Sequence, residues 1–123
     1  MDKKKILVVD DEEDILSILR LRLEANNYEV LTASDGQEGL DKARAEKPDL
    51  MILDLMLPKL DGYEVCRMLK LDEAYKTLPI IIVTAMAEQK YEDIGGDMGA
   101  DAYITKPFEP EILLNKIREL LNK

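Results

Sequence analysis

Four apolar runs of this chain are each followed by, or end in, polar residues that could act together in chemistry. The residues are Asp10 and Asp11 after the first run, Asp54 after another, and Thr84 and Lys106 at the ends of the last two. Carboxylate oxygens favour a hard cation such as Mg²⁺, which uses one or two carboxylates and keeps several waters. Three carboxylates in one crevice also need a counter-charge, because they cannot all stay ionised without one. The pattern predicts a magnesium site, provided that the fold gathers these residues.

The same residues could take part in phosphoryl transfer. The chain has no histidine, which removes the usual general base and the usual activator of a serine nucleophile. The nucleophile would then be a carboxylate, and Asp54 is the best candidate because Asp10 and Asp11 are paired as metal holders. Thr84 could donate a hydrogen bond to the phosphoryl group, and Lys106 could supply a positive charge. The predicted product is an acyl phosphate on Asp54.

Each of these residues also has a purely structural interpretation. An Asp–Asp pair at the end of a strand is more often a helix N-cap with an acidic first turn, a role that residues 11–13 would serve. Asp54 could begin a turn, Thr84 could be a hydroxyl at a strand end, and Lys106 could be a surface charge. For any one residue the structural interpretation is the commoner one. Their coincidence at one predicted edge of a sheet favours the chemical interpretation.

The elements that would position these residues alternate along the chain. The pattern predicts strands within 5–9, 28–33, 49–55, 78–85 and 101–107, and helices within 12–25, 36–46, 61–71, 88–98 and 109–123. Five such units predict an α/β fold, a parallel sheet with helices on both faces. Right-handed crossovers favour strand order 2-1-3-4-5, a single doubly wound, flavodoxin-like domain. Ligands of such sheets bind where the order reverses, between the first and third strands.

Length and charge narrow the function classes. The 123 residues suit one compact domain spanning 1–123, and a formal charge of −9 argues against direct binding of nucleic acid or anionic membranes. No apolar run approaches the ~20 residues of a membrane span, and nothing resembles a signal peptide. The only cysteine, Cys66, excludes an internal disulfide. These features predict a cytoplasmic domain.

Along its whole length the sequence resembles the receiver domain of two-component response regulators. The matching segments are ILVVDDEEDI, PDLMILDLMLPKLDGYEV, LPIIIVTA and GADAYITKPF. The resemblance implies a switch whose Asp54 accepts a phosphoryl group from a sensor histidine kinase or a histidine phosphotransfer protein. Such a domain is not an enzyme, apart from catalysing its own phosphorylation and slow dephosphorylation. It would act as a monomer or as a phosphorylation-dependent dimer.

The resemblance also implies a metal site and a gate for water. Asp11 and Asp54 would bind Mg²⁺ directly, together with the backbone carbonyl of Met56, while Asp10 would act mainly through water. Met56 and Met86 occupy positions similar to a gate that controls the water attacking the phosphoryl group. Both are large and apolar here, so they should crowd that path and lengthen the lifetime of the phosphoryl group.

Further roles implied by the resemblance concern the switch itself. Thr84 and Lys106 would hold the phosphoryl oxygens, and Tyr103 resembles the aromatic residue that turns inward when Thr84 is drawn to the phosphate. The Lys106–Pro107 peptide bond is expected to be cis. Output would use the surface of the fourth helix, fifth strand and fifth helix, where Gly96 replaces the bulky apolar residue that is usual in the family.

Two other function classes remain open. A Mg²⁺-dependent phosphatase of the haloacid dehalogenase kind also uses an Asp nucleophile with Thr and Lys, but it needs a second Asp where this chain has Met56. A flavodoxin-like nucleotide carrier needs a phosphate-binding loop after the first strand, where DDEED would repel phosphate. Turnover of a phosphomonoester would support the first class, and a yellow protein the second. The sequence leaves open the kinase, the signal, the output and whether the natural chain continues into an effector domain.

Overall fold

A computed structural model of the chain describes residues 3–85 and 99–122. Helices and strands alternate through this part of the chain. They are β1 (Lys5–Val9), α1 (Glu13–Ala25), β2 (Glu29–Ala33), α2 (Gly36–Glu46), β3 (Leu50–Leu53), α3 (Gly62–Leu71), β4 (Ile80–Thr84), β5 (Ala102–Thr105) and α5 (Pro110–Leu121). Each lies within a predicted element; β1 and α2 match their predicted ranges, and the other elements are slightly shorter. The helix predicted for 88–98, with its two glycines, lies outside the described residues.

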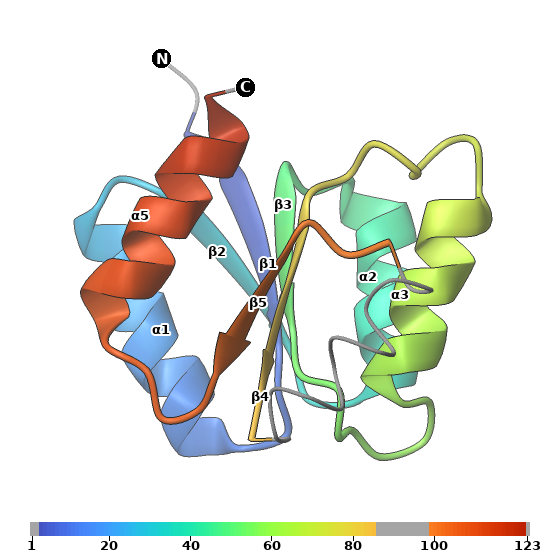
Figure 1. The fold of residues 1–123 in the computed structure, drawn as a ribbon, viewed down its shortest axis with the longest axis horizontal. Helices are drawn as coiled ribbons and strands as arrows, with labels where there is room; N and C mark the ends of the chain where they lie inside the picture. Colours follow the sequence, from blue (N-terminus) through green and yellow to red (C-terminus); the bar gives the residue numbers. More distant parts are fainter. Residues whose placement is uncertain (1–2, 86–98, 123) are drawn as a thin grey trace.

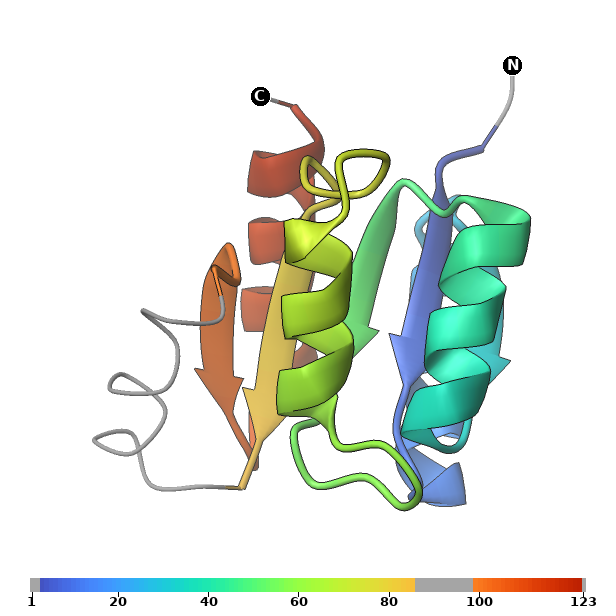
Figure 2. The ribbon, with the colours of Figure 1, turned by 90° about the vertical axis from the view of Figure 1, so that its right-hand side faces the viewer.

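The strands form one parallel sheet in the order β2-β1-β3-β4-β5, which confirms the predicted order. The chain goes outward from β1 to β2 and then returns past β1 to β3, so the order reverses between β1 and β3. Figure 2 shows the arrowheads of all the strands at one edge of the sheet. The two chain ends lie at the opposite edge (Figure 1). Residues that follow β1, β3 and β5 therefore emerge together.

Helices cover both faces of the sheet (Figure 1), with α2 and α3 on one face and α1 and α5 on the other. Successive side chains of β1 enter opposite cores: Leu7 and Val9 face α2 and α3, whereas Ile6 and Val8 face α1 and α5. Because both faces are covered, the strand is apolar along its whole length instead of alternating. Among the described residues, no helix has both the length and the apolarity needed to cross a bilayer.

The helix starts explain part of the acidic sequence. At α2, the Asp35 carboxylate accepts a hydrogen bond from the Glu38 N–H at 2.7 Å, and the Glu38 carboxylate accepts one from the Ser34 N–H at 2.8 Å. Such reciprocal bonds satisfy backbone donors that the helix leaves open. At α1 the N-cap residue is Glu12, and its side chain makes no capping bond. Only Glu13 and Asp14, in the first turn of α1, fit the structural interpretation of the acidic run.

Candidate functional site

The carboxyl edge of the sheet carries Asp10, Asp54 and Lys106 directly after β1, β3 and β5. Backbone hydrogen bonds continue the ladders beyond the strand ends and hold these residues in place. The bonds run from the Asp10 N–H to the Ala33 carbonyl at 3.0 Å, from the Asp54 N–H to the Val9 carbonyl at 3.0 Å, and from the Lys106 N–H to the Thr84 carbonyl at 2.8 Å. Thr84 is the last residue of β4 and is fully buried. The predicted gathering is confirmed for these residues.

The Lys106 ammonium lies among carboxylates. Its Nζ atom is 2.7 Å from Asp10 Oδ2, 3.0 Å from Asp54 Oδ2 and 3.3 Å from Glu12 Oε1. The side chains of Asp10, Asp54 and Lys106 are only 4%, 7% and 11% exposed. Charges this buried are tolerated only when they are paired. Lys106 thus supplies the counter-charge that these carboxylates require, in addition to its predicted role toward the phosphoryl group.

The pKa values follow from burial and pairing. Burial raises the pKa of Asp10, against the opposing effects of the Lys106 ammonium and of the Glu12 N–H. For Lys106, burial alone would lower the pKa, but hydrogen bonds and charge attraction from Asp10 and Asp54 together raise it above the ordinary value. At neutral pH the ammonium therefore keeps its proton, and the site holds a fixed positive charge beside the carboxylate of Asp54.

Glu12 belongs to this site and was missed from the sequence. One oxygen each of Asp10, Glu12 and Asp54 lie within 4.8 Å of one another, close enough to share a metal ion. A set made only of carboxylate oxygens suits a hard cation. Asp10 Oδ1 also accepts a hydrogen bond from the Glu12 N–H at 2.9 Å. Asp often makes this contact two residues along the chain, so the spacing of Asp10 and Glu12 was the available signal.

Asp11 and Met56 lie differently from what their predicted roles suggested. The side chain of Asp11 is exposed and does not belong to the group formed by Asp10, Glu12 and Asp54. The predicted side-by-side grouping of Asp10, Asp11 and Asp54 is therefore wrong for Asp11, although its direct metal binding stays a prediction. The Met56 N–H donates to Asp54 Oδ1 at 3.1 Å, while residue Met56 as a whole is 65% exposed. The other predicted gate residue, Met86, lies outside the described residues.

The predicted switch residue Tyr103 lies in β5, next to the strand that ends in Thr84. Its ring is half-buried and packs against the core on the α2 and α3 side of the sheet. The Lys106–Pro107 peptide bond is cis, as the family resemblance implied. Inward movement of Tyr103 stays a prediction.

Comparison with known proteins identifies the family. The family model for the response regulator receiver domain matches residues 6–118. This chain belongs to the response regulator receiver domain family. The acidic edge formed by Asp10, Glu12 and Asp54 is consistent with the phosphorylation site of a receiver domain. The family assignment and this edge together support a role as a phosphorylation-dependent signalling switch.

Individual relatives agree with this assignment. The alkaline phosphatase synthesis transcriptional regulatory protein PhoP of Bacillus subtilis is 49% identical over 120 residues, which are 98% of this chain and 49% of that protein. The chain spans about half the length of the curated relatives it matches. A solved receiver domain protein from Methanospirillum hungatei has a TM-score of 0.91 and 36% identity, with 98% of this chain and 95% of that chain covered.

A further solved relative is the receiver domain of a sensor histidine kinase from Pseudomonas aeruginosa. It has a TM-score of 0.91 and 27% identity, with 99% of this chain and 100% of that chain covered. Its structure was determined with a magnesium ion coordinated in the active site cleft.

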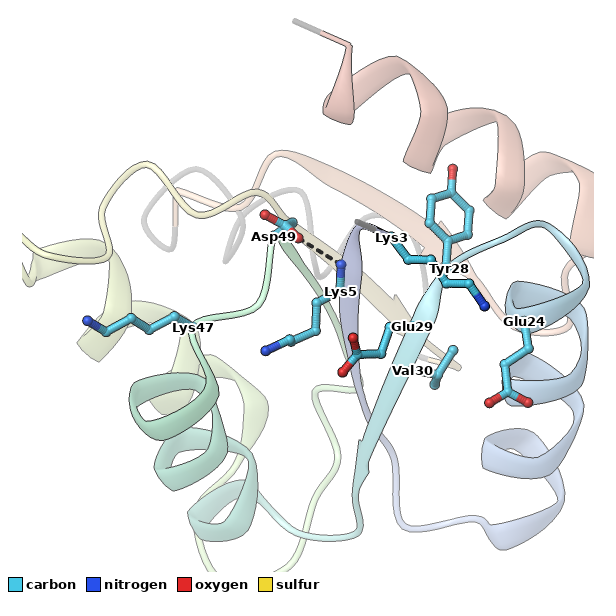
Figure 3. A pocket seen from close by; sticks show the side chains of 8 residues that line it. All are labelled: Lys3, Lys5, Glu24, Tyr28, Glu29, Val30, Lys47 and Asp49. Atoms are coloured by element: carbon cyan, nitrogen blue, oxygen red, sulfur yellow. Dashed lines mark hydrogen bonds between the residues drawn. The ribbon is translucent and has the colours of Figure 1, made fainter. Parts of the chain in front are cut away.

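The receiver domain also has a pocket of 730 Å³ at the opposite edge of the sheet, near the starts of β1, β2 and β3 (Figure 3). Its lining carries charges of both signs. Lys5 is tied to the chain before β3, because its N–H donates to Asp49 Oδ2 at 2.7 Å. Figure 3 shows the side chains of Lys3 and Lys47 extending in opposite directions. The ammonium groups of Lys3 and Lys47 therefore do not converge on one position, in contrast to the charges around Asp54.

Proposed function

We propose that Asp54 of this receiver domain accepts a phosphoryl group from a phosphorylated histidine, with Lys106 and Thr84 holding the phosphoryl oxygens. The observation that carries the proposal is the contact between Lys106 Nζ and Asp54 Oδ2 at 3.0 Å, at a buried edge where a second acid is also paired. A nearly buried carboxylate beside a fixed positive charge is suited to receive an anionic group, because the ammonium offsets the charge that arrives.

In the proposed transfer, a carboxylate oxygen of Asp54 attacks the phosphorus of phosphohistidine. The phosphorus–nitrogen bond breaks, a phosphorus–oxygen bond forms, and the imidazole leaves with the electron pair and takes up a proton. Lys106 already contacts the acceptor, so it can reach a phosphoryl oxygen by a small movement of its flexible side chain. Thr84 ends the neighbouring strand, where its hydroxyl could turn toward the same group. The donor would be a sensor histidine kinase or a histidine phosphotransfer protein.

The same edge fits Mg²⁺. Asp11, Asp54 and the backbone carbonyl of Met56 would bind the ion directly. Asp10 would act through a bound water. A bound Mg²⁺ would neutralise charge between the acceptor and the phosphoryl group. The magnesium ion in the related receiver domain from Pseudomonas aeruginosa supports this proposal. The all-oxygen set of Asp10, Glu12 and Asp54 supports it independently.

The proposed switch runs from Thr84 to Tyr103. The two residues lie on paired neighbouring strands, with Thr84 opposite Thr105 and Tyr103 opposite Ile82. Attraction of Thr84 toward the phosphoryl group would open space for the Tyr103 ring, which would alter the surface of β5, α5 and the fourth helix. That surface would engage an output partner or a second receiver domain. Transcription control, which the name of the Bacillus relative states for that protein, is our proposal for the whole protein.

Phosphoramidate, a small phosphodonor with a phosphorus–nitrogen bond, tests the proposal. Intact mass spectrometry should show one added phosphoryl group in the presence of Mg²⁺ and none in EDTA. The protein should not turn over a phosphomonoester such as p-nitrophenyl phosphate, because Met56 stands where a phosphatase of the haloacid dehalogenase kind needs an acid. Steady release of p-nitrophenol that depends on Asp54 would instead favour the phosphatase.

A further inference from the structure

Glu12 has no assigned role in the phosphoryl transfer proposed above, although it contacts the same lysine. Its carboxylate lies 3.3 Å from Lys106 Nζ and its side chain is 60% exposed, whereas the side chains of Asp10 and Asp54 are 4% and 7% exposed. Lys106 therefore has two buried partners and one partner at the rim that faces solvent. The hydrogen bond from the Glu12 N–H to Asp10 Oδ1 at 2.9 Å keeps the backbone of Glu12 beside the site.

The ammonium and a divalent cation would be attracted to the same acids. The acids whose oxygens could share a metal ion are Asp10, Glu12 and Asp54, and these side chains are the ones that contact Lys106 Nζ. A cation drawn to these acids repels the ammonium, because charge repulsion is weakly screened at a buried edge. Binding of the cation therefore draws the ammonium away from Asp10, while Asp54 stays within its reach for phosphoryl transfer. A displaced ammonium still needs a negative partner, because an unpaired charge at a buried edge is costly.

We propose that Glu12 is a positioning residue that receives the Lys106 ammonium when Mg²⁺ binds, and thereby strengthens Mg²⁺ binding. Glu12 is already in contact with the ammonium and is the most exposed of its partners, so the lysine can swing outward without breaking that ion pair. Without Glu12, the ammonium would stay between Asp10 and Asp54 and would compete with the cation. The inference rests on the proposed function, since it takes Mg²⁺ to bind beside Asp54.

A double-mutant cycle on the Mg²⁺ dissociation constant, measured by isothermal titration calorimetry, tests the role of Glu12. Glu12→Gln should weaken Mg²⁺ binding by roughly two- to five-fold, the range for an ion pair with one exposed partner. Lys106→Met should strengthen binding, because the competing charge is gone. In the Lys106→Met background, Glu12→Gln should have no more effect than Glu13→Gln. Glu13 is the matched control, because it carries the same charge in the first turn of α1.

Two results would overturn the inference. An unchanged dissociation constant in Glu12→Gln would show that the Lys106–Glu12 contact has no bearing on the cation. An equal loss of affinity with and without Lys106 would show that Glu12 attracts the cation by its charge and not through the lysine. Failure of the proposed function would be distinct: the wild type would then bind no Mg²⁺, or Asp54→Asn would leave its binding intact.

A second measurement avoids any substitution of Lys106. A crystal structure of the wild type with Mg²⁺ should place Lys106 Nζ within ion-pair distance of Glu12 and away from Asp10. An ammonium that remains on Asp10 beside the bound ion, or that leaves Glu12 for solvent, would contradict the proposed movement.

Discussion

Replacing Lys106 by methionine should destabilise the metal-free protein more than the loss of an ordinary surface lysine. Methionine keeps most of the side-chain length but removes the only positive charge that contacts Asp10 and Asp54 in the described part of the chain. The side chains of those two acids are 4% and 7% exposed. In Lys106→Met, two nearly buried carboxylates would face each other without a counter-charge. Such a site disfavours folding, because the same carboxylates are solvated in the unfolded chain.

Two considerations set the size of the loss in unfolding free energy. Removing one partner of a buried ion pair typically costs about 3–5 kcal/mol. The loss is also limited because one carboxylate can take up a proton, which at pH 7 costs about 4 kcal/mol for an Asp of ordinary pKa. The free energy of unfolding of Lys106→Met in EDTA should thus be about 3–4 kcal/mol below that of the wild type. That is a large part of the 5–15 kcal/mol typical of a single domain.

Urea denaturation followed by circular dichroism, in EDTA and in Mg²⁺, measures this loss. Mg²⁺ at about 100 times its dissociation constant should restore about 2.7 kcal/mol, since the ion replaces the missing charge. Lys116→Met is the matched control, because Lys116 pairs with Glu119 on the exposed face of α5 and such pairs contribute about 0–1 kcal/mol. If Lys106→Met lost no more stability than Lys116→Met, the account of Lys106 as the internal counter-charge would be refuted.

The pH dependence of these stabilities has a definite sign. In the wild type the pKa of Lys106 is raised on folding, so its stabilising effect is complete below the ordinary lysine value of about 10.4 and is lost only as pH rises beyond it. The loss of unfolding free energy caused by Lys106→Met should depend on acid pH instead. This loss should decrease as pH falls toward about 4, where carboxylates become protonated in the unfolded chain as well.

Three further substitutions test other parts of the account. Asp10→Asn should raise the free energy of unfolding in EDTA at pH 7, because burial raises the pKa of Asp10 and so disfavours its charged form. This gain in stability should vanish as pH falls toward about 4, the pKa of Asp in the unfolded chain. A loss of stability at pH 7 would contradict the prediction. Gly62→Ala should cost about 1–3 kcal/mol in urea denaturation, since its Cβ would overlap the Asp54 carbonyl oxygen and approach Leu55 Cα to 2.7 Å; an unchanged midpoint would show that the loop adjusts freely. Met56→Asn should shorten the phosphoryl lifetime about tenfold, or roughly 1.4 kcal/mol of barrier, by orienting water, and an unchanged decay at fixed Mg²⁺ would remove Met56 as a gate.

The fold could be predicted because the signals in the sequence are redundant. Runs such as KILVV are apolar at every position, which is typical of a strand covered on both faces, and the intervening helical patterns leave little choice of topology. Strand and helix ends were less certain. The predicted strand 49–55 is reduced to Leu50–Leu53, although the Asp54 N–H still bonds to the Val9 carbonyl on the neighbouring strand. The predicted helix 12–25 begins one residue late, because Glu12 turns back toward Asp10.

The site was only partly predictable. Asp10 and Asp54 follow directly from strand order, since a parallel sheet delivers its carboxyl ends to one edge. The position of the Lys106 ammonium does not follow from strand order. A long flexible side chain can turn toward any nearby carboxylate, and the positions of the carboxylates are known only from the folded structure. The contribution of Glu12 depends on one local turn, and the exposure of Asp11 depends on the same turn. Residue types and spacing therefore predicted that Asp10, Asp54, Thr84 and Lys106 gather at one edge of the sheet, while the pairing among the charged groups required the structure.

The most direct test of the central claim is to locate the phosphoryl group. The wild type and Asp54→Asn would be incubated with acetyl phosphate and Mg²⁺, trapped with borohydride, digested and mapped by mass spectrometry. The account predicts reduction of the acyl phosphate at Asp54 alone in the wild type, and no trapped product in Asp54→Asn or in EDTA. A trapped product at another residue, or labelling that survives Asp54→Asn, would contradict it.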